Sequence, residues 1–191
     1  MAKLSDSKED KILAAAWKLF KRHGFKKVTL GEIAEAAGIS RPTLYAVFDN
    51  KEALIDRFVR EACLVKNAET ERAISKEKDL RRRLEMLFEI WIVEPFISHL
   101  DNESFKELMT AVSLYAPEAV DESYEQFRKY TADLLEPHLS KRSKLGADEL
   151  AQIIANATRG FKASARTPSE LKHMVDGLIL MTLNMFDKRS L

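Results

Sequence analysis

Apolar residues recur every three to four positions along most of the chain, which is the spacing of amphipathic α-helices. The pattern predicts helices over about 9–23, 51–75, 80–92, 103–115, 117–137 and 148–165, and a last helix over about 168–186. Alternation of apolar and polar residues, which would indicate strands, is scarce, and six glycines and five prolines are few for 191 residues. The sequence therefore predicts an all-α fold.

Residues 29–51 carry the clearest local signals. Thr29 is a good N-cap, and Glu32 three residues later can complete a capping box. Gly38 supplies the positive φ that ends a first short helix, and Ser40 can cap a second one. Two short helices joined by a glycine turn predict a helix-turn-helix, whose second helix enters the major groove of DNA. In that second helix we expect Leu44, Val47 and Phe48 to point inward, and Pro42, Thr43, Tyr45 and Ala46 to point outward.

The segment from residue 12 to 58 resembles the DNA-binding domain of TetR-type transcriptional regulators. The matching motifs are an Ala-rich helix ending in HGF, then T-x-x-x-I-A-x-x-A-G-I-S, then T-L-Y-x-x-F followed by N-K-E-A-L. The resemblance implies a ligand-responsive repressor that binds a palindromic DNA operator as a homodimer and is released by a small effector. Relatives often carry an aromatic residue or His where this chain has Val47, which cannot hydrogen-bond a phosphate. The resemblance places the operator contacts on Thr29, Ser40, Arg41, Pro42, Thr43, Tyr45 and Lys51.

The remaining helices predict a second domain. A helix of about 25 residues from Lys51 would be roughly 37 Å long and would connect the two parts. We therefore expect a three-helix DNA-binding domain in residues 1–50 and a helical effector-binding and dimerisation domain in residues 51–191. The segment GLILMTLNMF, residues 177–186, is apolar on nearly every face and must be covered on all sides. We predict a homodimer through the last two helices; the alternative is a core helix inside a monomer.

The family resemblance also implies a pocket for a small effector in the second domain. Such a pocket would be lined by apolar and aromatic side chains, although the same residues at helical spacing are what any core requires. They favour a largely apolar or aromatic effector, while Glu89 and Glu94 leave a cationic one open. The candidate lining residues are Phe88, Trp91, Phe105, Met109, Phe127 and Tyr130.

The charge distribution and the cysteine content bear on the binding partners and the cellular location of the protein. The net charge is +1, but residues 1–51 hold ten basic and six acidic residues, and the remainder holds 21 and 24. A basic first domain suits an approach to phosphate, and ordinary surface charge explains the numbers equally well. The single cysteine, Cys63, allows no intrachain disulfide. With no apolar run near the roughly 18 residues of a membrane span and no signal-peptide pattern, we expect a cytoplasmic protein without a membrane partner.

The sequence lacks the signatures of catalysis. It contains no H-E-x-x-H, G-x-S-x-G, P-loop or G-x-G-x-x-G motif, and its four histidines show no metal-ligand spacing. We therefore predict no catalytic residue, no metal and no cofactor. Two other readings stay open: an architectural DNA-binding protein of the same fold without an effector, and a small helical enzyme for which no acid–base pair can be named.

Overall fold

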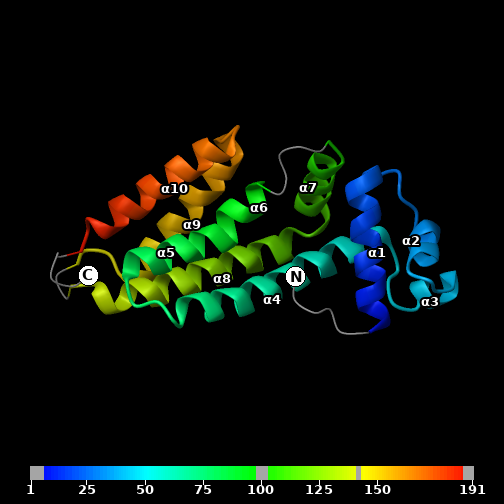
Figure 1. Cartoon of the computed structure of the whole chain (residues 1–191), viewed down its shortest axis with the longest axis horizontal. Helices are drawn as coiled ribbons and strands as arrows, with labels where there is room; N and C mark the ends of the chain where they lie inside the picture. Colours follow the sequence, from blue (N-terminus) through cyan, green and yellow to red (C-terminus); the bar gives the residue numbers. More distant parts are fainter. Residues whose placement is uncertain (1–6, 98–102, 141–142, 187–191) are drawn as a thin grey trace. The chain divides into compact units, whose positions relative to one another are not determined.

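The computed structural model describes residues 7–97, 103–140 and 143–186, and of residues 103–105 the backbone only. This part of the chain is helical, as the sequence predicted (Figure 1). It forms two compact units: Met1–Val65 with His99–Ser123, and Lys66–Ser98 with Tyr124–Leu191. Among the described helices, none is both long enough and apolar enough to cross a membrane.

The first unit is built around α1 (Lys8–His23). Against it lie α2 (Leu30–Ala36) and α3 (Arg41–Tyr45), the N-terminal part of α4 (Lys51–Ile74), α7 (Glu103–Tyr115) and the start of α8 (Pro117–Leu135). Their apolar faces share one core, and the residues that line it from the first four helices are completely or almost completely buried. These residues are Ile12, Leu13, Ala16, Phe20, Ile33, Ala34, Leu44, Leu54 and Ile55.

The helix ends of this unit follow the predicted local chemistry. Gly24 ends α1 with φ of +83°, and Gly38 provides the turn between α2 and α3 with φ of +68°. Both values lie in the left-handed region, which a residue with a Cβ adopts only under strain. The prediction for Val47 was wrong: its side chain is 42% exposed. Because α3 ends at Tyr45, the helical phase that keeps Leu44 buried no longer sets the direction of Val47.

The second unit is a bundle of the C-terminal parts of α4 and α8 with α5 (Leu80–Phe88), α9 (Ala147–Ser164) and α10 (Pro168–Leu183). A π-helical turn, η1 (Glu89–Val93), continues α5 into α6 (Glu94–Ile97), and a 3₁₀ turn, η2 (Glu136–His138), follows α8. The last helix, α10, packs against α5, η1 and α9. Leu171, Val175 and Ile179 on α10 are buried there.

The π-helical turn has a cause in the sequence. Pro95 has no N–H, so it cannot bond the carbonyl of Trp91 as an α-helix requires, and its ring crowds that carbonyl. The preceding turn is therefore wider than an α-helical one: the N–H of Glu94 donates to the carbonyl of Glu89, five residues back. All four residues from Ile90 to Val93 are consequently buried, among them Trp91. Pro95 thus widens the helix, which continues into α6 instead of ending before the proline.

Candidate nucleic-acid interface

The outer side of α3 is open to solvent. Pro42 and Ala46 are exposed, Thr43 is half-buried, and the Tyr45 side chain is 54% exposed. Leu44 anchors the helix by its complete burial in the core of the first unit. The helix begins where Ser40 accepts a hydrogen bond from the backbone N–H of Thr43 at 3.2 Å, and the two hydroxyls lie 2.7 Å apart. A short helix therefore presents a small polar face with one aromatic hydroxyl.

Thr29 fixes the start of α2 through the predicted capping box. The Glu32 N–H donates to Thr29 Oγ1 at 3.3 Å, and the Thr29 N–H and hydroxyl both donate to Glu32 Oε2, at 2.7 and 2.8 Å. These hydrogen bonds, the backbone one foremost, lower the pKa of Glu32 below its ordinary value. Thr29 itself is exposed at the N-terminus of the helix, where backbone N–H groups favour an anion.

Arg41 lies against a glycine of the neighbouring helix. A Cβ placed on Gly31 of α2 would come within 2.8 Å of the Arg41 guanidinium. The absence of a side chain at Gly31 thus leaves the space in which this guanidinium rests, at the exposed end of α3. No local sequence pattern points to Gly31, because its importance depends on a contact between two helices.

Lys51, at the start of α4, directs its ammonium group to the protein's own backbone. Its Nζ donates to the carbonyl oxygens of Phe25 at 2.9 Å, Val28 at 2.8 Å and Lys26 at 3.4 Å, and it lies 4.6 Å from the centre of the Phe25 ring. The side chain therefore holds the segment between α1 and α2. The Lys51 backbone lies at the N-terminus of α4, and a phosphate contact by this residue stays a prediction.

The same segment is held from a second direction. Glu107 on α7 accepts a hydrogen bond from the backbone N–H of Lys26, and its carboxylate lies beside Gly24, whose missing Cβ leaves room for it. Residues 24–28 are thus tied by side chains of α4 and α7 together. This long-range contact joins residues 81 positions apart, and no pattern in the sequence pointed to it.

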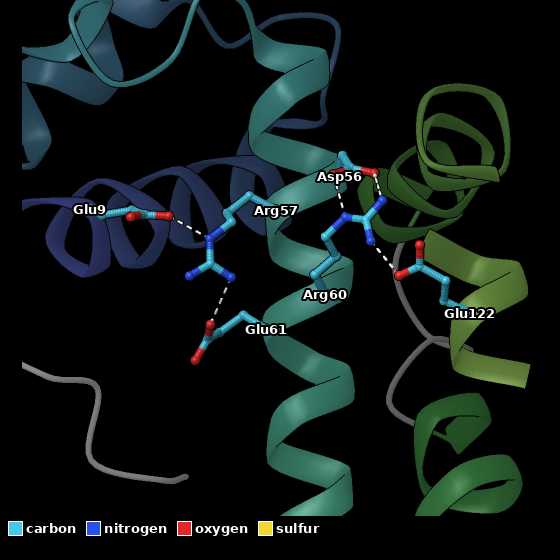
Figure 2. A network of polar contacts seen from close by, with 6 residues as sticks. All are labelled: Glu9, Asp56, Arg57, Arg60, Glu61 and Glu122. Atoms are coloured by element: carbon cyan, nitrogen blue, oxygen red, sulfur yellow. Dashed lines mark hydrogen bonds and ion pairs between the residues drawn. The ribbon is translucent and has the colours of Figure 1, made fainter. Parts of the chain in front are cut away.

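Two arginines join α4 to its neighbours in the first unit (Figure 2). Arg57 pairs with Glu9 of α1 and, at 2.9 Å, with Glu61 of its own helix. Arg60 pairs with Glu122 of α8 and, at 2.8 Å, with Asp56. The hydrogen bond from Arg60 lowers the pKa of Glu122, and the bonds to Glu122 and Asp56 raise the pKa of Arg60. These pairs are partly exposed, so each contributes only modestly to stability. Their role is to orient α4 against the neighbouring helices.

The structure separates the predicted effector-pocket residues. Phe88, Trp91, Phe127 and Tyr130 lie together in the second unit: the Phe88 and Phe127 rings meet edge to face with centres 5.2 Å apart, and Trp91 lies 6.4 Å from Phe127 and 6.1 Å from Tyr130. Met109 instead packs against the core of the first unit. The side chain of Phe105 lies outside the described residues.

The aromatic cluster includes polar partners that the sequence analysis missed. The indole N–H of Trp91 donates to the hydroxyl of Thr70 at 2.7 Å, and both residues are almost fully buried. Asn67, one turn before Thr70 on α4, has a buried Oδ1 without a hydrogen-bond partner in the described part of the chain. The one available signal was that Asn67 and Thr70 share a helix face in a largely charged stretch.

In this all-α chain, the short exposed helix α3 follows the capped helix α2 after a glycine turn. This arrangement defines a helix-turn-helix protein. A sequence profile for bacterial regulatory proteins of the tetR family matches residues 12–58. The transcriptional regulator EthR of Mycobacterium tuberculosis is 30% identical over 158 residues, covering 78% of this chain and 71% of that protein. EthR of Mycolicibacterium smegmatis is 32% identical over 106 residues, covering 53% of this chain and about half, 49%, of the length of that relative.

Solved structures share the fold. A transcriptional regulator from Rhodococcus sp. RHA1 superposes with a TM-score of 0.70 at 17% identity, covering 95% of this chain and 98% of that one. Thermus thermophilus FadR, a TetR-family repressor solved with lauroyl-CoA, gives a TM-score of 0.64 at 18% identity, covering 92% and 93%. The chain therefore belongs to the TetR family of bacterial regulatory proteins. The predictions of a regulator with a DNA-binding domain, and not an enzyme, are confirmed at the level of this family.

Proposed function

We propose that the protein is a ligand-responsive transcriptional repressor, acting in the cytoplasm, that binds a palindromic DNA operator as a homodimer. A small, largely apolar effector would release it. Residues 1–50 would read the DNA, and residues 51–191 would bind the effector and dimerise. The observation that carries the proposal is the exposed outer face of α3 on a buried anchor, Leu44, because a helix can enter the major groove only with such a face.

In this proposal Tyr45 and Thr43 contact the DNA with their hydroxyls, and Arg41 contacts a base or a phosphate. Pro42 packs against the edge of the groove. Thr29, Ser40 and Lys51 meet phosphates at three helix N-termini, where unpaired N–H groups and the helix dipole favour anions. Because the Lys51 ammonium is occupied by carbonyls in the free protein, we assign its phosphate contact to the backbone.

The homodimer is supported by the outer faces of α9 and α10. Four large apolar side chains on or directly after these helices are exposed, with Met181 at 69%. Large apolar side chains exposed on neighbouring helices are typical of interaction sites in soluble proteins. A second copy covers both helices at once and forms a four-helix interface. The side chains are Ile153, Leu180, Met181 and Met185.

An effector site is supported by the aromatic cluster of the second unit. Trp91 donates to the Thr70 hydroxyl, and the Tyr130 hydroxyl donates to the backbone carbonyl of Asn67 at 3.5 Å. The side chain of Asn67 adds a buried, unpartnered Oδ1 on the same helix, α4. Apolar walls with a few polar groups are the usual composition of a small-molecule site. The FadR structure with lauroyl-CoA is an example of this fold with such a ligand.

One observation favours a second candidate, a DNA-binding protein of the same fold without an effector. Phe88 and Phe127 are fully buried and in mutual contact, as in a filled core. Thermal unfolding in the presence of apolar metabolites separates the two candidates. An effector raises the melting temperature by mass action, whereas a filled core responds to none of them.

The DNA-binding proposal is tested by selection from a random duplex library with the full chain. We expect enrichment of an inverted repeat whose half-sites are about 34–36 Å apart, or a multiple of this. Tyr45→Ala should weaken binding to the selected sequence, while Leu64→Ala, which truncates an exposed apolar side chain on α4, should not. Selection without any enriched sequence, or equal binding by both variants, would contradict the proposed interface.

A further inference from the structure

The segment between α1 and α2 presents two adjacent lysines to solvent (Figure 1). Lys26 and Lys27 are both exposed. The residues on either side of them, Phe25 and Val28, are only 5% and 2% exposed and belong to the core of the first unit. Because both flanking side chains are anchored in this core, the two lysines between them are held at the surface.

The backbone that carries these lysines is fixed from two other helices. The Lys51 ammonium of α4 donates to the carbonyls of Phe25 and Val28 at 2.9 and 2.8 Å. From α7, the Glu107 carboxylate accepts a hydrogen bond from the backbone N–H of Lys26. A segment that is already ordered in the free protein loses little backbone freedom when it binds a partner. The two lysines are therefore pre-organised for binding.

Both ammonium groups are available to an external anion. Across residues 7–97, 103–140 and 143–186, no carboxylate forms an ion pair with Lys26 or Lys27, and neither side chain donates a hydrogen bond. The carboxylate of Glu107 is bound to the backbone, and that of Glu32 is bound to Thr29. The two lysines thus differ from Lys51, whose ammonium is bound to carbonyl oxygens inside the protein.

The lysines lie directly before the N-terminus of α2. An extended chain advances at most about 3.3–3.6 Å per residue, so Lys27 lies within about 7 Å of Thr29, and Lys26 within about 11 Å. Each strand of B-DNA carries one phosphate per roughly 3.4 Å of helix axis. A phosphate bound at Thr29 therefore has neighbours on the same strand within reach of long lysine side chains.

The composition of this surface favours a polyanion over a protein partner. Lysine is depleted in protein–protein interfaces, whose centres are formed by large apolar and aromatic side chains. Within residues 7–44 no large apolar side chain is exposed. A lysine ammonium is a compact point charge on a flexible stem, which suits phosphate contacts that need no fixed geometry.

We propose that Lys26 and Lys27 bind backbone phosphates of duplex DNA, next to the phosphate at the N-terminus of α2. The DNA interface then extends beyond the two short helices to the segment that connects α1 and α2. The inference rests on the DNA-binding function proposed above and adds two contact residues to it. Phosphate contacts position a protein on the duplex and carry no sequence information, so these lysines contribute affinity and not specificity.

The test measures the salt dependence of DNA binding by the full-length protein. Fluorescence anisotropy is recorded over a range of salt concentrations with the selected duplex and with a shuffled duplex of equal length. The variants are the double substitutions Lys26→Met with Lys27→Met, and Lys26→Arg with Lys27→Arg. The control is Lys76→Met with Lys78→Met, which removes the same charge from exposed positions between α4 and α5 in the second unit. Urea unfolding verifies that each variant is folded.

We expect the methionine pair at positions 26 and 27 to reduce the slope of log affinity against log salt by about 3.6, because two lysines in each subunit of the proposed homodimer contribute about 0.9 each. Between 50 and 200 mM salt the wild type should then lose about 150-fold more affinity than this variant. The reduction should be the same for both duplexes. The arginine pair and the control pair should keep the wild-type slope.

Four results would overturn the proposal. The first is a reduction no larger than about 1.8, which one contact per subunit would give. The second is an equal reduction in the control pair, since net charge alone would then explain the effect. The third is a change confined to the selected duplex, which would assign the lysines to base contacts. The fourth is a wild type that binds neither duplex, which would also overturn the DNA-binding function. Tight binding of the selected duplex by all four proteins with one common slope overturns the lysine contacts alone.

Discussion

The role of Lys51 gives the sharpest test of how the DNA-binding helices are held. We consider Lys51→Met, which keeps an unbranched apolar stem of similar length and removes the ammonium. The change leaves three backbone carbonyls without this donor, two of them previously at 2.8 and 2.9 Å and one at 3.4 Å. These carbonyls belong to residues 25–28, which connect α1 to α2.

The expected loss of stability follows from these contacts. The carbonyls are only partly buried and regain water, so each of the two short hydrogen bonds is worth about 1 kcal/mol, less than is usual for a charged donor. The attraction between the ammonium and the Phe25 ring, 4.6 Å away, adds about 0.5–1 kcal/mol. The free energy of unfolding should therefore fall by about 2.5–3 kcal/mol. Urea unfolding at a fixed protein concentration measures it, with Lys18→Met, an exposed lysine of α1, as the control.

The same variant separates a structural lysine from a phosphate-binding one. If each Lys51 side chain contacts a phosphate, its loss from both subunits of the proposed homodimer should reduce the slope of log affinity against log salt by about 1.8. We expect the slope to stay unchanged, because the ammonium is bound to the backbone. Unchanged stability together with a slope reduced by about 1.8 would refute this reasoning. It would show that the Lys51 ammonium leaves the backbone carbonyls and binds a DNA phosphate.

Three further outcomes are expected. Thr70→Val should lower the free energy of unfolding by about 1–3 kcal/mol, because it leaves the buried indole N–H of Trp91 without an acceptor; in a Trp91→Phe background the same change should cost less, which a double-mutant cycle by thermal unfolding would reveal. Burial lowers the pKa of Lys162 to about 8 in the folded state, against an ordinary 10.5. The unfolded chain therefore binds more protons between these values, and stability should rise with pH across that window. The rise should be absent in Lys162→Met, and an identical pH profile for the two proteins would contradict the burial of the ammonium. Met181→Glu places a charge on the most exposed apolar position of α10 and should shift the protein toward a monomer in light scattering, and an unchanged mass would exclude Met181 from the interface.

The local sequence determined most of the helices and their ends. The α7 helix has the predicted bounds, and the capping box of Thr29 with Glu32 and the left-handed Gly38 are present as predicted. Caps, glycine turns and apolar periodicity involve residues within four positions of each other, so they can be recognised along the chain. The same periodicity failed at Val47, because α3 ended sooner than its apolar pattern suggested.

Only the tertiary structure decided which long side chains hold the site together. Lys51 could have pointed to phosphate or to the backbone, and the carbonyls that bind it lie 23 to 26 positions earlier. Glu107 and Lys26 are 81 positions apart, and Arg60 and Glu122 are 62 apart. Lysine, arginine and glutamate are ordinary on helix surfaces, so their identity predicts no partner. Their partners are fixed by helix packing, which depends on contacts between distant parts of the chain.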